Sequence, residues 1–236
     1  MSDIQTRFVR DGYVIERQDD IRSKVSEINS IFGLKYCSRF SLDYEANRNL
    51  IKRFADSIEL ADLFATKQLI ELVRHLGCAT PVYCGPVVSH YTHTDVTGNS
   101  YGLPWHQDFP SMASSSRSVI VWISVNDCSL QTHSIEVVPG RHVNGLLQGS
   151  QRDNGYVLTQ QVFENSCVLE IDAGDILIFS PYLPHRTFVN PSSADYKLSF
   201  SRRFDDLDDT EWSRNKFANA YGTVVNRNLY KSIKHY

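Results

Sequence analysis

This chain of 236 residues has few cysteines and no long apolar run. The five cysteines are odd in number and scattered, and none forms a Cys-x-x-Cys pair, so the sequence indicates neither a disulfide framework nor a zinc knuckle. We expect all five to be reduced thiols: Cys37, Cys78, Cys84, Cys128 and Cys167. No segment approaches the ~18 apolar residues of a membrane-spanning helix, and the polar N-terminal residues do not resemble a signal peptide. We therefore expect a soluble, cytoplasmic protein with no membrane partner.

The sequence also has no excess of positive charge. Its formal net charge is −3, and 22% of its residues are charged. Neither a basic field that would attract nucleic acid nor a polybasic arm that would bind anionic lipid is present. We therefore expect the partner to be a small molecule, while the composition leaves the oligomeric state open.

The spacing of apolar residues changes once, near Gly77. Before this glycine, apolar residues recur at helical spacing, as Leu50, Ile51, Phe54 and Ile58 do, and Gly77 itself suits the position just after a helix end. We expect these helices to pack against a sheet. The whole is expected to form one domain, residues 1–236, with a helical front (about 1–77), a β-rich core (about 78–205) and a C-terminal tail (206–236).

Short runs of β-branched and aromatic residues follow Gly77, each bounded by turn residues. They predict strands within residues 81–91, 118–125, 134–138, 166–171, 175–180 and 196–204. Strands of this length and spacing are typical of a sandwich or barrel and not of alternating βαβ units. In the tail, aromatic residues among polar ones favour a helix that covers a sheet edge: Trp212, Phe217, Tyr221 and Tyr230.

Residues 103–108 (LPWHQD) place His106 and Asp108 two positions apart. On an extended strand such side chains project from the same face and can grip one ion together. A third ligand is available downstream in His185, which follows the apolar run 176–179. Two imidazoles and one carboxylate leave open positions on an octahedral metal, as Fe(II) needs in order to bind a bidentate co-substrate and O₂. A zinc site with the same ligands is also possible.

A second His-x-Asp pattern, His93 and Asp95, precedes the first by a short distance. Spacing alone cannot choose between the two. We prefer His106 and Asp108 because they follow an apolar lead, whereas His93 and Asp95 adjoin a loop-like segment at 96–100.

Together with other motifs, these residues resemble the phytanoyl-CoA dioxygenase family of 2-oxoglutarate oxygenases. Several motifs carry the resemblance in the right order: 8–15 (FVRDGYVI) resembles the opening strand of the family, 103–108 its first metal motif, 121–127 (VWISVND) a core strand, 138–142 (VPGRH) its Pro-Gly turn, and 174–185 its second metal motif. The resemblance covers most of residues 8–204, without the segment 37–73 and the tail.

The resemblance implies a mainly β fold with flanking helices, the double-stranded β-helix or cupin-like jelly roll. It also implies that His106, Asp108 and His185 bind Fe(II), with 2-oxoglutarate and O₂ as co-substrates. Decarboxylation of 2-oxoglutarate to succinate and CO₂ would drive oxidation of an unactivated C–H bond in a small-molecule metabolite or natural-product intermediate. Because the carboxylate Asp108 is present, hydroxylation or desaturation is favoured over halogenation, for which family relatives place a small residue there.

One position departs from the family pattern. The family usually places an arginine after the second histidine to hold the distal carboxylate of 2-oxoglutarate, and this chain has Lys197, which offers a point charge instead of a bidentate fork. Ser199 lies on the same strand face and could add a hydroxyl donor, whereas Arg203 lies further along and ranks second as the anchor. By family position, Thr187 would assist the carboxylate end and Trp122 would line the co-substrate pocket.

The sequence defines the substrate-binding residues less well than the metal ligands. Polar residues near the motifs are candidates for orienting a small molecule at the pocket mouth: Gln107, His93, Tyr101, Arg117 and Arg141. No basic cluster suits the phosphates of a CoA thioester. Two other readings remain open, a non-catalytic jelly-roll binding or sensor protein, and a zinc hydrolase that uses the same three ligands without 2-oxoglutarate.

Overall fold

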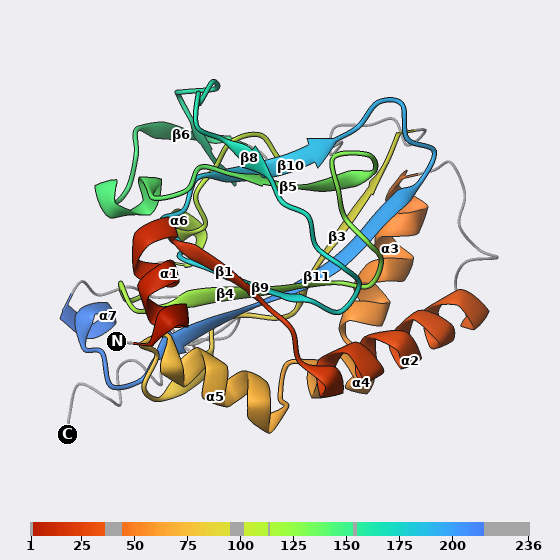
Figure 1. Ribbon diagram of the computed structural model, residues 1–236, viewed down its shortest axis with the longest axis horizontal. Helices are drawn as coiled ribbons and strands as arrows, with labels where there is room; N and C mark the ends of the chain where they lie inside the picture. Colours follow the sequence, from red (N-terminus) through yellow and green to blue (C-terminus); the bar gives the residue numbers. More distant parts are fainter. Residues whose placement is uncertain (1, 36–43, 95–101, 113, 153–154, 215–236) are drawn as a thin grey trace.

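The computed structural model describes residues 2–35, 44–94, 102–112, 114–152 and 155–214. Two β-sheets face each other, and helices cover the outer side of the larger sheet (Figure 1). The helices are α1 (Asp3–Asp11), α2 (Asp19–Lys35), α3 (Tyr44–Ala55), α4 (Ile58–Leu63), α5 (Lys67–His75), α6 (Phe109–Met112), the 3₁₀ helix η2 (Arg141–Asn144) and α7 (Glu211–Arg214). The strands are β1 (Tyr13–Glu16), β2 (Pro81–Tyr83), β3 (Val88–His93), β4 (Val119–Ser124), β5 (His133–Val137), β6 (Gly149–Arg152), β7 (Gly155–Leu158), β8 (Cys167–Val168), β9 (Ile176–Phe179), β10 (His185–Val189) and β11 (Tyr196–Asp206).

The strands pair in an antiparallel manner throughout the described ladders. The larger sheet has the order β1-β9-β4-β11-β2, and β3 also pairs with β11. The smaller sheet has the order β10-β5-β8, and β6 and β7 form a hairpin. Strands distant in sequence thus become neighbours, as in a jelly roll, and the predicted fold is confirmed.

Strand β4 lies at the centre of the molecule and is buried on both faces. Val121 and Ile123 point toward the helices, where they join the cluster that includes Ile21 and Phe54. Ile120 and Trp122 alternate with them and face the smaller sheet. Burial of one such side chain contributes about 1.5–3 kcal/mol, so both clusters stabilise the position of this strand. The face with Trp122 forms one wall of the cavity described below.

The N-terminal segment corrects one expectation. Phe8 was predicted to lie in an opening strand, but it lies in α1, and the strand begins only at Tyr13. The helix starts at a capping box, in which Ser2 accepts from the backbone N–H of Gln5 and the Gln5 side chain accepts in return from the Ser2 backbone. It ends at Gly12, whose φ of 82° is unfavourable for other residues and where a side chain would collide with the His142 ring.

The other strand predictions agree in location and differ in extent. Each predicted segment contains a strand, but the segment 81–91 is divided into β2 and β3 at Gly85, whose φ is 94°. The sequence pattern did not reveal β10 or the hairpin of β6 and β7. Gly77 lies just beyond α5, as expected, and the front helices share one hydrophobic cluster with the larger sheet.

Some expectations reach beyond the described residues. The tail is described only as far as α7, so Phe217, Tyr221 and Tyr230 lie outside it. The cysteines of the described residues are free thiols, while Cys37 lies outside them. Among the described helices, none has the length and apolar character needed to cross a bilayer.

Candidate active site

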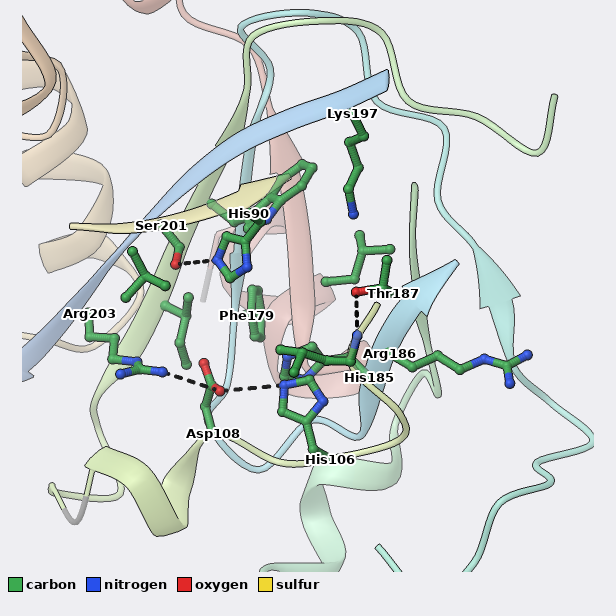
Figure 2. A pocket seen from close by; sticks show the side chains of 15 residues that line it. His90, His106, Asp108, Phe179, His185, Arg186, Thr187, Lys197, Ser201 and Arg203 are labelled. Atoms are coloured by element: carbon green, nitrogen blue, oxygen red, sulfur yellow. Dashed lines mark hydrogen bonds and ion pairs between the residues drawn. The ribbon is translucent and has the colours of Figure 1, made fainter. Parts of the chain in front are cut away.

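A cavity of about 560 Å³, including its open mouth, lies between the two sheets (Figure 2). Its walls come from β3, β4, β9 and β11 of the larger sheet and from β5 and β10 of the smaller sheet. Apolar side chains contribute to its lining: Val88, Leu103, Ile120, Trp122, Ile135 and Phe179. The cavity thus combines apolar walls with convergent polar groups, as small-molecule sites do.

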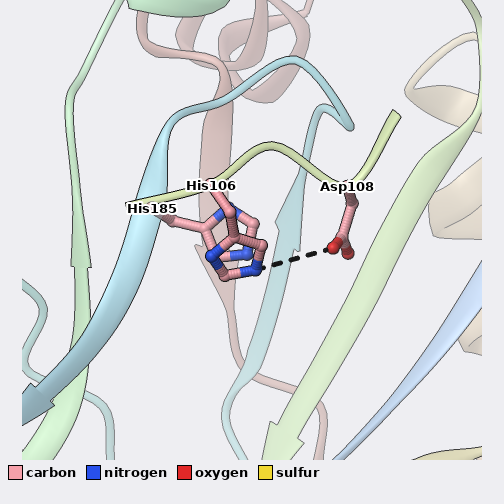
Figure 3. Close-up of side chains that lie close together, drawn as sticks. All are labelled: His106, Asp108 and His185. Atoms are coloured by element: carbon pink, nitrogen blue, oxygen red, sulfur yellow. Dashed lines mark ion pairs between the residues drawn. The ribbon is translucent and has the colours of Figure 1, made fainter. Parts of the chain in front are cut away.

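Three potential metal ligands meet at this cavity. The ligand atoms of His106, Asp108 and His185 all lie within 4.8 Å of one another (Figure 3). Nε2 of His106 is 3.7 Å from Oδ1 of Asp108, and the centroids of the two imidazole rings are 4.1 Å apart. The two residues of the first predicted motif therefore lie beside the histidine of the second.

The backbone positions the two imidazoles, although the local structure differs from the expectation. Residues 103–108 do not form a strand; His106 makes isolated bridges to Val157 and His185 instead. The backbone N–H of His106 donates to the carbonyl of His185 at 2.9 Å, and the reverse bond measures 3.0 Å. Asp108 follows at the start of α6, where its carbonyl accepts from the N–H of Ser111 and of Met112.

Hydrogen bonds also select the tautomer of each histidine. Nδ1 of His106 lies 2.8 Å from the carbonyl of Pro104, and Nδ1 of His185 lies 2.9 Å from the carbonyl of Leu183. Because a carbonyl only accepts, each Nδ1 carries a proton, and in the neutral form of the ring Nε2 is the nitrogen with a free lone pair. This arrangement is common among metal-binding histidines, so the donor set fits a divalent metal.

Electrostatics holds His185 and Asp108 in the protonation states that a metal requires. Burial, and then the neighbouring His106, lower the pKa of His185 to about 3 and keep its imidazole neutral. Burial alone would raise the pKa of Asp108, but Arg203 and the two histidines outweigh it and hold that pKa well below its usual range. Neutral imidazoles and an ionised carboxylate are the forms that ligate metals.

Lys197 occupies the end of the cavity away from Asp108 (Figure 2). Its side chain is 3% exposed, and Nζ donates to the carbonyl of Ser134 at 3.1 Å. Nζ also lies 5.8 Å from the centroid of the Trp122 ring. Burial lowers the pKa of Lys197 to about 8. Thr187 lines the same cavity, and its hydroxyl accepts from the backbone N–H of Leu103 at 3.0 Å.

The other two predicted co-substrate residues lie elsewhere than expected. Ser199 is fully buried but does not line the cavity, and its hydroxyl oxygen has no hydrogen-bond partner among the described residues. Arg203 does line the cavity, yet Nη2 lies 3.5 Å from Oδ1 of Asp108, at the metal end. The next residue back, Arg202, points the other way and stacks on Tyr83 at 3.9 Å.

His90 is a cavity residue that the sequence did not reveal. It projects from β3, and Nε2 lies 3.0 Å from the hydroxyl of Ser201 (Figure 2). Burial, and then the charge of Lys197, lower the pKa of His90 to about 3, so the ring is neutral. The only signal in the sequence was a histidine inside a predicted strand, and its importance depends on the pairing of β3 with β11.

Most of the residues predicted to contact substrate do not face the cavity. The amide of Gln107 is used by the backbone: it donates to the carbonyls of Gly145 and Tyr182 at 2.9 and 2.5 Å and accepts from the N–H of Leu147 at 2.8 Å. Gln107 is 2% exposed and therefore supports the fold around the site.

The remaining candidates are at the surface or outside the described residues. Arg117 pairs with Asp206 at 3.0 Å and with Asp209 at 3.3 Å. Arg141 is exposed on η2, and His93 lies at the end of β3 opposite Tyr196. None of these three lines the cavity. Tyr101 and Asp95 lie outside the described residues, so the rival His-x-Asp pattern has no described geometry.

A jelly roll whose cavity gathers two imidazoles and one carboxylate is characteristic of mononuclear non-haem iron oxygenases. The family model of phytanoyl-CoA dioxygenase (PhyH) matches residues 38–197, and the chain belongs to this family. It is thus an Fe(II)- and 2-oxoglutarate-dependent oxygenase, as the resemblance implied. No curated protein sequence matches the chain significantly.

Solved structures show the same fold at low sequence identity. EvdO2 from Micromonospora carbonacea var. aurantiaca is 13% identical, with a TM-score of 0.62 and coverage of 89% of this chain and 94% of that one. EctD from S. alaskensis, solved with 2-oxoglutarate and 5-hydroxyectoine, is 15% identical, with a TM-score of 0.61 and coverage of 88% and 77%. The nickel complex of the non-haem monooxygenase ThoJ is 14% identical, with a TM-score of 0.60 and coverage of 86% and 77%.

Proposed function

We propose that this enzyme hydroxylates a small-molecule metabolite or natural-product intermediate, with Fe(II) held by His106, Asp108 and His185 and with 2-oxoglutarate anchored by Lys197. The observation that carries the proposal is the placement of the three ligands and the buried lysine around one cavity. When bound, iron and 2-oxoglutarate supply the oxidation, in which 2-oxoglutarate and O₂ are converted to succinate, CO₂ and the hydroxylated product.

The residues of the chain have separate tasks in this proposal. The Nε2 atoms of His106 and His185 and the carboxylate of Asp108 would hold the metal. Lys197 neutralises the distal carboxylate of 2-oxoglutarate at the far end of the cavity, and Thr187 is the neighbouring hydroxyl. Trp122 and Phe179 give this space apolar walls that exclude water from the reacting groups.

The carboxylate Asp108 supports hydroxylation over halogenation, because no ligand position is left to a small residue. The cavity must hold the co-substrate as well, and its volume of about 560 Å³ includes the open mouth, so the space that remains suits a small prime substrate. A zinc hydrolase would have no use for a buried cation at the far end of the cavity, so Lys197 favours the oxygenase reading.

The test is succinate formation from 2-oxoglutarate by anaerobically purified protein supplied with Fe(II), ascorbate and air. The His106→Ala variant should lose this activity, and the His75→Ala variant, a matched change on α5 in the helical layer, should retain it. The visible absorption band of the anaerobic Fe(II)–2-oxoglutarate complex provides a second readout that requires no substrate. Absence of both succinate and the band from the unaltered protein would contradict the proposal.

A further inference from the structure

Arg203 is another cation of the cavity, and it lies at the opposite end from Lys197 (Figure 2). The two side chains share one face of β11 and are six residues apart, on the order of 20 Å of strand. Nη2 of Arg203 is 3.5 Å from Asp108, which places the guanidinium beside the proposed metal ligands. In 2-oxoglutarate, two methylene groups separate the distal carboxylate from the 2-oxo acid end, which is the end that would bind the metal. Arg203 is therefore badly placed to hold that carboxylate.

The hydrogen bonding of Arg203 is incomplete. A guanidinium has five N–H donors. Nε of Arg203 is buried without a hydrogen-bond partner among the described residues, and the ion pair with Asp108 involves a carboxylate that we assign to the metal. Ser201, two residues earlier on the same face, also lines the cavity and is 4% exposed, and its hydroxyl lies 3.0 Å from Nε2 of the neutral His90. A cation and a neighbouring hydroxyl thus face one end of the cavity.

The charges of the loaded site do not balance. Fe(II), Lys197 and Arg203 together would carry four positive charges, whereas the 2-oxoglutarate dianion and Asp108 carry three negative charges, and Arg203 shares Asp108 with the metal. Arg186 also reaches the cavity, but it pairs with Glu136 at 2.5 Å. His90 is neutral. One net positive charge therefore remains in the site, at the end where Arg203 lies, and such an excess charge is unfavourable until an anion binds.

We propose that Arg203, assisted by Ser201, binds a carboxylate of the prime substrate, which makes that substrate a small organic acid. This inference rests on the proposed function, since it assigns one cation to each of two bound acids. It also places the oxidised C–H bond close to the carboxylate, because Arg203 lies beside the metal ligand Asp108. Arg203 then selects substrates by charge, while the apolar walls accommodate the carbon chain.

The test compares Arg203→Gln with Arg202→Gln, a matched loss of charge on the opposite face of the same strand. The anaerobic Fe(II)–2-oxoglutarate complex of each protein is titrated with propionate and with its neutral isostere propionamide, and binding is read from the paramagnetic relaxation of the methyl protons of the probe. We expect saturable propionate binding to the unaltered enzyme and to Arg202→Gln. It should be weaker by about tenfold or more in Arg203→Gln, because a charge-assisted hydrogen bond is lost. Arg203→Lys should restore part of it.

The visible band separates the ways in which this inference can fail. Equal propionate binding by Arg203→Gln and the unaltered enzyme, with the band intact, would overturn the inference and leave the proposed function standing. Arg203→Gln could instead bind 2-oxoglutarate about tenfold more weakly, which would assign Arg203 to the co-substrate, or lose iron, which would make it a positioning residue for Asp108. Both results would overturn the substrate assignment. A missing band in the unaltered enzyme would overturn the proposed function and this inference together.

Discussion

His106 and His185 exchange two backbone hydrogen bonds, each N–H donating to the other carbonyl at 2.9 and 3.0 Å. Residues far apart in the sequence thus form a narrow antiparallel pair, and their rings lie with centroids 4.1 Å apart. The Nδ1 atom of each ring is held by a carbonyl two residues earlier in the chain. The orientation of both imidazoles is therefore set by the backbone, and Asp108 completes the group.

Replacing Asp108 by Ala should remove iron-supported succinate formation. The loss of a ligand should weaken iron binding by more than the ~10–100-fold that loss of a supporting contact costs. Metal analysis after gel filtration and the succinate assay measure the two effects. Asp95→Ala serves as the control and should keep both. If Asp95→Ala loses iron and Asp108→Ala keeps it, the other His-x-Asp pattern is the metal site.

Replacing Lys197 by Ala should weaken 2-oxoglutarate binding while iron stays bound. Loss of a charge-assisted contact in a buried site corresponds to about 10- to 100-fold in affinity. Titration of the visible band of the Fe(II) complex measures it, and Lys67→Ala, a change of an exposed lysine on α5, is the control. Unchanged affinity in Lys197→Ala would show that another group anchors the co-substrate.

The affinity for 2-oxoglutarate should fall as the pH rises above about 8. Burial lowers the pKa of Lys197 to about 8, so the cation that the carboxylate needs is present below this pH and is lost above it. Cys128, His90 and His133 are titratable groups coupled to this lysine, and both histidines have a lowered pKa and stay neutral here. At higher pH the affinity should drop by about tenfold per unit.

Lys197→Arg is the control for this pH dependence, because an arginine stays charged across the range. Whatever its absolute value, the affinity of this variant for 2-oxoglutarate should not change between about pH 7 and about pH 9.5. A decline of equal slope in both proteins would assign the titration to a group other than Lys197.

Replacing Gln107 by Leu should destabilise the protein. The substitution leaves the N–H of Leu147 and the carbonyls of Gly145 and Tyr182 without their present partner. The expected cost is about 1–3 kcal/mol, and each kcal/mol lowers Tm by about 2–4 °C. Thermal unfolding followed by circular dichroism measures this, with the exposed Gln131→Leu as control. An unchanged Tm would leave the substrate role open again.

The parts of the site that the sequence predicted best are those encoded by local pattern. His106 and Asp108 are neighbours in the chain, and the apolar run of β9 leads directly to the segment with His185, so motif and order were sufficient. The runs of β-branched and aromatic residues also located β4 and β11. Residues 8–11, which the resemblance assigned to an opening strand, lie in α1, and the capping box of Ser2 and Gln5 is the local signal for this helix.

The remaining features depend on tertiary contacts. His90 becomes a cavity residue only because β3 pairs with β11, a register that no local pattern reveals. Gln107 lies between two proposed ligands in a polar motif and resembles a substrate contact, yet its amide is saturated by backbone groups from loops distant in the sequence. Arg203 shares a face with Lys197, but its distance to Asp108 was not contained in the alternation of the strand.

Strand β11 is hydrogen-bonded to β3 and β4 along the segment from Lys197 to Arg203. The backbone positions of Lys197 and Arg203 are therefore fixed relative to each other, and the strand sets the distance between them. Because adjacent residues face opposite sides, a one-residue slip would turn both cations toward the helical layer, and only even steps preserve the site. A relative of this enzyme that accepts a longer or shorter acid would therefore relocate the arginine by two residues along this strand, not by one.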